Sequence, residues 1–211
     1  MKKLWLRKED KTGERRVPIT PAEVVELVQA GVEVTVERCN QRCYTDADYE
    51  AAGALLTDAI WQQAPRDTVV LALKELADST EPVAHSQIHF SHTFKGQEGA
   101  KEMLARYARG GGAIYDLEFL FDTQGRRVAA FGYWAGYVGA ALGLLGVAHY
   151  SIKSTDFPAL QPFSDRDALL ATVDTALQES GWDDGSLSVL IMGALGRCGS
   201  GARDLIGSVR Y

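Results

Sequence analysis

Short apolar runs rich in β-branched residues alternate with helix-forming segments through residues 1–131, and this alternation constrains the fold more than any other feature. Residues 68–74 form an apolar run, rich in residues that favour strands, that ends in a lysine. This pattern is typical of a central parallel strand. Parallel strands joined by helices form a sheet with helices on both faces. We therefore predict a doubly wound α/β layer with strands at 3–6, 32–37, 68–74, 87–94 and 113–120.

Helix start signals support this reading. Thr20 is the expected N-cap of the first helix, with Pro21 at its first position, Glu23 completing a capping box and Gly31 ending it. Further helices are predicted at 44–53, 56–64, 97–112 and 168–181.

The segment 128–148 carries no charged residue and is long enough to span a bilayer. Its glycines recur in steps of three and four, which places them on one helical face, where another backbone can approach closely. Each glycine costs about 1 kcal/mol of helix stability relative to alanine, so packing must compensate. We predict a buried interdomain helix rather than a membrane span, with the stripe formed by Gly132, Gly136, Gly139, Gly143 and Gly146.

The overall composition favours a globular protein with a small-molecule partner. Apolar residues make up 46% of the chain, and the net charge of -6, without a basic cluster, argues against nucleic acid. Three cysteines without paired spacing indicate neither a zinc site nor a disulfide framework. The start of the chain lacks the apolar stretch of a signal peptide, so we expect a cytoplasmic protein.

A glycine-rich turn near the end of the chain resembles a phosphate-binding loop. The apolar run 189–192 is predicted as a strand and 202–209 as a helix, with glycines at 193, 196, 199 and 201 between them. A turn between a strand and a helix presents free N–H groups and the positive helix end to an anion. The acidic residue that holds a ribose is expected about 20 residues further on. The sequence therefore predicts at most half of a nucleotide site.

Lys74 and the histidines of 85–92 are candidates for acid–base chemistry. Lys74 is predicted at the carboxyl end of a buried strand, where α/β proteins bind ligands, although a strand-end lysine that reaches solvent is an equally good interpretation. His85, His89 and His92 would align as metal ligands on a helix, but a strand sends His89 and His92 to opposite faces, so we expect no metal. His92, close to Lys95, is the preferred acid–base partner of Lys74.

Arg16 and Arg127 lie in predicted loops. A guanidinium can bind a carboxylate through two hydrogen bonds, which would suit a dicarboxylate or amino-acid substrate. The alternative is a solvated surface arginine, the usual state of this residue.

Several of these segments resemble a known family. ERRVPITP at 14–21 is similar to a signature shared by alanine dehydrogenase, the N-terminal part of transhydrogenase and saccharopine dehydrogenase. More specific segments look like the NAD-dependent, lysine-forming saccharopine dehydrogenases: LKE at 73–75, HFSHTFKGQ at 89–97, YDLEFL at 115–120, QGRRVAAFGYWAG at 124–136 and GALGRCGSGA at 193–202.

The resemblance implies oxidative deamination of saccharopine to lysine and 2-oxoglutarate, with hydride passing to NAD. It implies that Lys74 is the base that deprotonates the secondary amine and that His92 handles water addition and carbinolamine collapse. Further roles follow by position: Glu75 and Glu118 as carboxylates that tune the substrate site, Arg16, Lys95, Arg127 and Phe131 as substrate-binding residues, and Gly193, Gly196, Arg197, Cys198 and Gly199 as the cofactor loop.

The same resemblance implies three regions: a Rossmann-like substrate-side α/β domain at 1–131, an interdomain helix with a connecting segment at 132–185, and the first βα unit of a Rossmann-like NAD domain at 186–211. We therefore expect a fragment of a longer enzyme, one part of a split enzyme completed by a second chain, or a shortened relative without catalysis. Alternative functions are an alanine dehydrogenase-type enzyme and a non-catalytic binding module.

Overall fold

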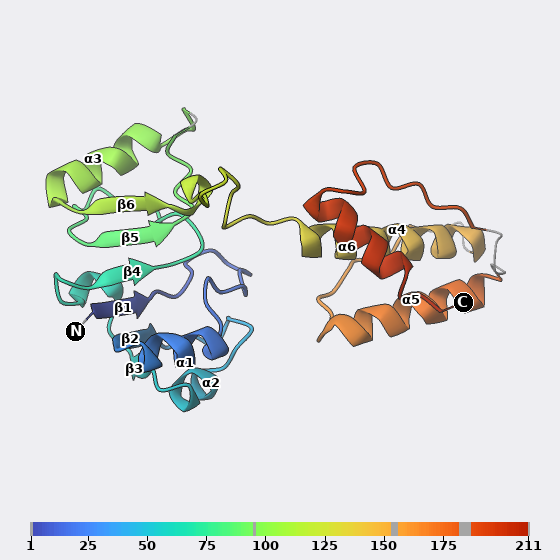
Figure 1. Cartoon of the computed structure of the whole chain (residues 1–211), viewed down its shortest axis with the longest axis horizontal. Helices are drawn as coiled ribbons and strands as arrows, with labels where there is room; N and C mark the ends of the chain where they lie inside the picture. The colour runs from blue at the N-terminus through green and yellow to red at the C-terminus, as the bar shows by residue number, and fades with distance from the viewer. Residues whose placement is uncertain (1, 95, 153–155, 182–186, 211) are drawn as a thin grey trace. The chain divides into compact units, whose positions relative to one another are not determined.

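The structure is a computed structural model that describes residues 2–94, 96–152, 156–181 and 187–210. The chain divides into two compact units, residues 1–129 and 130–211, and each is described by itself (Figure 1).

A six-stranded, fully parallel sheet organises the first unit. The strand order is β3-β2-β1-β4-β5-β6, so the chain begins in the middle of the sheet, builds to one edge and then returns to build the other (Figure 1). This arrangement confirms the predicted doubly wound α/β fold. The strands are β1 (Lys2–Leu6), β2 (Val32–Glu37), β3 (Leu55–Thr57), β4 (Val69–Leu71), β5 (Ser86–His89) and β6 (Ala113–Asp116).

Helices of this unit begin where the sequence signals them. α1 (Pro21–Gln29) has the expected capping box, in which the Thr20 side chain accepts from the Glu23 amide and the Glu23 carboxylate accepts from the Thr20 amide. α2 (Asp46–Ala51) repeats the device with Thr45 and Asp48, and α3 (Ala100–Gly110) ends before Gly111, which has a positive φ. Gly31, also at positive φ, follows the C-cap of α1.

Four elements of the first unit differ from their predicted type or bounds. The helix predicted at 56–64 is wrong: Leu55–Thr57 pairs with β2 as the edge strand β3, and only Trp61–Gln63 forms a 3-10 turn (η1). Pairing with a distant strand has overridden the local helix signal. The strand predicted at 113–120 stops at Asp116, whose carboxylate accepts the Glu118 amide and begins a second 3-10 turn, η2 (Leu117–Phe119). The strands predicted at 68–74 and 87–94 likewise end early, at Leu71 and His89.

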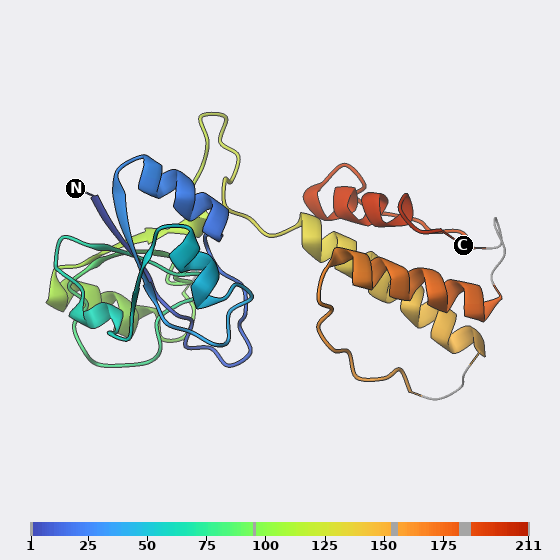
Figure 2. The ribbon, with the colours of Figure 1, turned by 90° about the horizontal axis from the view of Figure 1, so that it is seen from below.

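The two faces of the sheet bury separate cores. Trp5 and Leu6 are neighbours in β1, and because strand side chains alternate they enter different clusters. Leu6 packs with Val24 of α1, whereas Trp5 packs with Tyr107 of α3. Figure 2 shows α1 and α3 on opposite sides of the strands, as a doubly wound sheet requires.

The second unit consists, in its described part, of three helices: α4 (Tyr133–Ile152), α5 (Arg166–Ser180) and α6 (Arg197–Ile206). α4 packs against both of the others (Figures 1 and 2). The shared core includes Tyr137 and Leu144 of α4, Val173 of α5 and Leu205 of α6. The predicted helices near 128–148 and 168–181 are thereby confirmed; the position of α4 between two domains stays a prediction.

Only part of the glycine stripe on α4 serves close packing. A Cβ at Gly136 would collide with the Cys198 carbonyl, and one at Gly201 of α6 would collide with the Tyr133 carbonyl, so the α4 and α6 backbones approach through these glycines. Gly139 and Gly143 have open space beside them, as does Gly146.

Among the described helices, α4 alone has the length and apolar character to cross a membrane, with a mean hydropathy of 1.3. A core helix passes the same test, so length and composition do not separate the two cases. In this unit, α4 contributes the buried Ala141 and Ala148 to the core that it shares with α5 and α6.

The strand predicted at 189–192 is also wrong. These residues are in neither a strand nor a helix, and Leu190 and Met192 are 87% and 89% exposed. A strand forms only where a neighbouring strand supplies its hydrogen bonds, and the described residues of this unit include none. The following helix begins at Arg197, within the glycine-rich segment rather than after it.

Candidate active site

Charged side chains gather at the carboxyl edge of the first unit's sheet. Arg7 directly follows β1, Lys74 and Glu75 follow β4, His92 follows β5 and Glu118 lies in η2 after β6. Because all six strands are parallel, their carboxyl ends meet at one edge, the edge at which open α/β sheets bind ligands.

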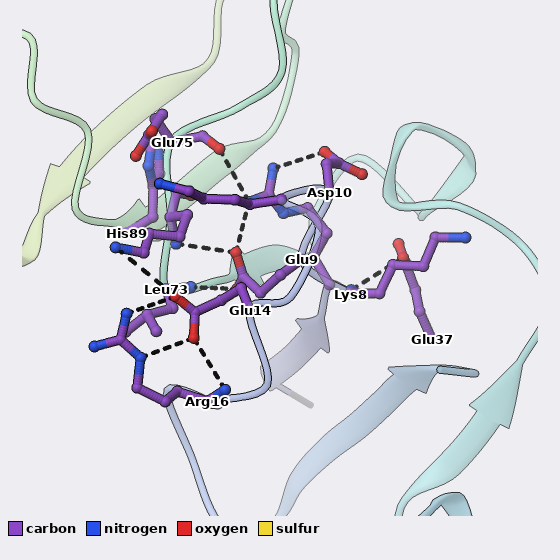
Figure 3. Close-up of polar contacts among 12 residues, drawn as sticks. Lys8, Glu9, Asp10, Glu14, Arg16, Glu37, Leu73, Glu75 and His89 are labelled. Carbon is purple, nitrogen blue, oxygen red and sulfur yellow. Dashed lines mark hydrogen bonds and ion pairs between the residues drawn. The ribbon is translucent and has the colours of Figure 1, made fainter. Parts of the chain in front are cut away.

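Glu14 links two of the predicted site residues. Its carboxylate accepts from the Arg16 Nε at 2.7 Å and lies 3.8 Å from the Lys74 ammonium nitrogen. Figure 3 shows the Glu14 and Arg16 side chains facing one another. The hydrogen bonds from the Arg16 side chain, then those from its backbone and the charge of Lys74, outweigh burial and lower the pKa of Glu14 to about 2. Glu14 is therefore a buried anion that lies beside both the Arg16 guanidinium and the Lys74 amine.

His92 and Glu75 form a second pair. The His92 Nδ1 lies 3.4 Å from a Glu75 carboxylate oxygen, and both side chains are 43% exposed. His92 has a φ of 53°, and no other non-glycine residue in the described chain has a positive φ. Such a backbone conformation is costly for a residue with a side chain and often occurs at functional sites. An imidazole next to a carboxylate, with access to solvent, can exchange protons with a substrate.

Glu118 and Arg127 form a third pair after β6. An Arg127 Nη1 lies 3.9 Å from the Glu118 carboxylate. The hydroxyl of Ser91 donates to Asp116 at 2.6 Å, which ties the loop after β5 to the end of β6. Five predicted residues therefore lie in pairs along one edge, together with Glu14, which was not predicted: Glu14–Lys74, Glu75–His92 and Glu118–Arg127.

The other two clustered histidines take no part in these pairs. His85 bonds the Ala64 carbonyl, and the His89 Nε2 lies 3.2 Å from the Tyr107 hydroxyl. Burial, followed by the charge of Arg7, lowers the pKa of His89 to about 4. Across the described parts of the chain, no three His, Cys, Asp or Glu side chains are grouped so that they could hold a metal ion.

Two predicted substrate-binding residues are not placed at this edge. Lys95 lies outside the described residues. Phe131 is an exposed residue of the second unit. Their roles stay predictions.

The glycine-rich segment forms a tight bend that leads into α6. Gly193 has a φ of 75°, and Gly196 is the N-cap of α6. A Cβ at Gly199 would collide with the Gly193 carbonyl, so this glycine lets the bend fold onto the helix. Arg197 and Cys198 are the first two residues of α6 and are exposed. Residues 196–198 are therefore exposed at the positive end of a helix, a position that suits an anion such as a phosphate.

The sequence analysis missed three buried or half-buried charges at the carboxyl edge: Arg7, Glu9 and Glu14. Glu14 stands two residues before Arg16, and this spacing was available as a signal. These residues line a small, narrow hollow. In the second unit, two larger apolar hollows lie between α4, α5 and 157–163, and a larger polar hollow lies beside α5 and 207–210. We assign chemistry to the edge because the titratable groups are there.

Residues 5–138 match the family described as alanine dehydrogenase/PNT, N-terminal domain. The chain belongs to this family. A solved L-alanine dehydrogenase superposes on 98% of the chain and 52% of its own length, with a TM-score of 0.55 and 17% identity, which supports the fold alone.

The motif resemblance to saccharopine dehydrogenases is also confirmed. The chain is 41% identical over 98% of its length to the lysine-forming, NAD(+) saccharopine dehydrogenase of Schizosaccharomyces pombe, and 44% identical over 94% to that of Neurospora crassa. It spans 57% and 54% of those relatives' lengths.

Proposed function

We propose that this alanine dehydrogenase/PNT-type chain carries the substrate side of a lysine-forming saccharopine dehydrogenase. The reaction is the NAD-dependent oxidation of saccharopine to lysine and 2-oxoglutarate, in lysine metabolism. Its main support is the identity of 41–44% to saccharopine dehydrogenases over nearly the whole chain. The pairs at the carboxyl edge supply the acid–base groups that this chemistry needs.

Lys74 takes the proton from the secondary amine of saccharopine. NAD, which the glycine bend at 193–199 would hold, would supply the hydride acceptor for oxidation of the adjacent C–N bond to an imine. His92, held near Glu75, activates the water that adds to the imine and then passes a proton to the departing lysine amine. The product carbonyl is that of 2-oxoglutarate.

Saccharopine carries three carboxylates, which call for cationic partners. Arg16 and Arg127 bind two of them, and Glu14 and Glu118 orient these guanidiniums from the protein side. Lys95 and Phe131 complete the substrate contacts. The glycine bend at 193–199 would hold the phosphates of NAD. The part of the relatives that this chain does not span would complete that cofactor domain. We place the enzyme in the cytoplasm.

The test is NADH formation from saccharopine and NAD by the protein as its own gene encodes it. We expect turnover with saccharopine, and with lysine plus 2-oxoglutarate in reverse. The family match makes an alanine dehydrogenase-type activity the second candidate, so pyruvate plus ammonia is assayed in parallel. Turnover of that pair alone would replace the proposal with the second candidate. If neither pair reacts and calorimetry of the protein with NAD and with saccharopine shows no heat of binding, the protein is a non-catalytic relative.

A further inference from the structure

A buried ion pair stands where β1 ends, and the acid–base pairs do not include it. The Arg7 side chain is 1% exposed and the Glu9 side chain 6%, and an Arg7 Nη2 lies 3.5 Å from a Glu9 carboxylate oxygen. Asp10, on the solvent side, lies 3.7 Å from the other Arg7 Nη. Charges this deeply buried are costly unless hydrogen bonds satisfy them. The other hydrogen-bond partners of Arg7 and Glu9 therefore indicate the role of this pair.

Both side chains bond the backbone around Lys74. The Glu9 carboxylate accepts from the Leu73 amide at 2.7 Å and from the Lys74 amide at 3.1 Å. The Arg7 guanidinium donates to the Lys74 carbonyl at 2.8 Å and to the Glu75 carbonyl at 3.4 Å. One buried ion pair just after β1 thus holds the peptide groups before and after Lys74. Figure 3 labels Glu9, Leu73 and Glu75 among the residues involved.

A gain in folding stability does not by itself explain a buried ion pair. Replacing such a pair by apolar residues is often neutral or stabilising, so we expect the Arg7–Glu9 pair to fix one conformation of the backbone that it contacts. The arrangement here matters because Lys74 and Glu75 are adjacent and face different partners, Glu14 at 3.8 Å and His92 at 3.4 Å. A shift of the backbone at 73–75 would displace both side chains together.

We propose that Arg7 and Glu9 are positioning residues that hold the Leu73–Glu75 backbone so that the Lys74 amine and the Glu75 carboxylate stand correctly for proton transfer. The catalytic part of this proposal rests on the proposed function. The contacts of Arg7 and Glu9 with the backbone of residues 73–75, here called the brace, can be tested without turnover. Burial raises the pKa of Glu9, and the Leu73 amide, Arg7 and the Lys74 amide oppose that rise, so these contacts help to keep the carboxylate charged.

The variants are Glu9→Gln and Arg7→Met, and the matched control is Asp67→Asn. Asp67 pairs with Lys3 of β1 at 2.8 Å just before β4, so the control removes an ion pair between the same two strands at the opposite edge. Native-state hydrogen exchange of the Leu73 and Lys74 amides is measured on the 211-residue protein, with the amides of β2 as the internal reference. Steady-state kinetics with saccharopine and NAD are measured on the protein as its gene encodes it.

In Glu9→Gln we expect the Leu73 and Lys74 amides to exchange about tenfold faster or more relative to β2, because each loses a charged acceptor. We expect kcat to fall by roughly 10²-fold while the KM for NAD stays within a factor of two. Arg7→Met should lower kcat similarly, and Asp67→Asn should change neither quantity.

Unchanged exchange at Leu73 and Lys74 in a folded Glu9→Gln variant would overturn the brace. Faster exchange with an unaltered kcat would overturn the positioning role, and an equal kcat loss in Asp67→Asn would do the same. If Glu9→Gln does not fold, the double variant Arg7→Met/Glu9→Gln, which removes both charges, takes its place under the same criteria. If the wild type has no turnover, the proposed function fails while the exchange result still decides whether the brace exists.

Discussion

The carboxyl edge of the sheet in the first unit buries charged side chains, whereas the segment around the glycine bend in the second unit exposes apolar ones. At the edge, charged groups such as Arg7 and Glu14 are buried and bonded to neighbours from the same unit. Before and within the bend, Leu190, Met192 and Leu195 are almost fully exposed. Exposed apolar clusters mark surfaces that other groups cover.

Because of this difference, we expect the two regions to respond differently to substitution. The edge already contains the partners that orient Lys74 and His92, so its chemistry can be tested residue by residue. The bend offers a helix N-terminus but no sheet in the described residues around it. We therefore expect substitutions at the edge to change catalysis and substitutions around α6 to change stability.

The largest expected effect is that of Lys74→Met. Loss of a general base lowers kcat/KM by roughly 10²–10⁴-fold. The measurement is NADH formation from saccharopine by the protein as its gene encodes it. Lys2→Met, an exposed lysine at the start of β1 and so at the opposite edge of the sheet, is the control and should leave kcat/KM unchanged. A wild-type rate in Lys74→Met would remove the base from this edge.

His92→Gln is expected to lower kcat by about 10²-fold, because the glutamine cannot exchange protons with water or the lysine amine. Because the His92 side chain is accessible to solvent, we also expect added imidazole to restore part of the rate that His92→Gln loses. A kcat in His92→Gln equal to that of the wild type would contradict the assignment.

Gly201→Ala should destabilise the second unit by about 1–3 kcal/mol, because the added methyl group has no room beside the Tyr133 carbonyl. Gly139→Ala, on α4 with open space around it, is the control and should stabilise the helix by up to about 1 kcal/mol. Denaturant unfolding of both variants measures the difference. Equal effects would mean that α4 and α6 do not approach as described.

The smallest expected effect concerns acid stability through Glu14. Its folded pKa of about 2 lies below the unfolded value of 4.5, so its contribution is fully present above pH 4.5 and is lost as pH falls toward 2. Since Arg16 is 55% exposed, solvent screening limits the contribution to about 1 kcal/mol. Glu14→Gln should flatten the pH dependence of unfolding in this window. An unchanged slope would show that the carboxylate is not paired in solution.

Much of the architecture could be predicted from local patterns. The capping box at Thr20 and the alternation of strands with helices act over a few residues, and both are confirmed. The strand β3 could not be predicted in this way, because Leu55 pairs with Thr35 across the intervening helix α2. The strand prediction at 189–192 is wrong for the converse reason: its composition favours a strand, but the described residues include no partner strand beside it.

For the candidate site, the sequence by itself predicted which groups to consider: Lys74 after a buried strand, His92 among three histidines, and the loop arginines at 16 and 127. Only the tertiary structure decided how they are held. Glu9 bonds an amide 64 positions away, and Glu14 reaches Lys74 because β1 and β4 are neighbours in the sheet. Local sequence patterns record interactions within a turn of chain, whereas the charges that orient a site come from whichever strands the fold places side by side.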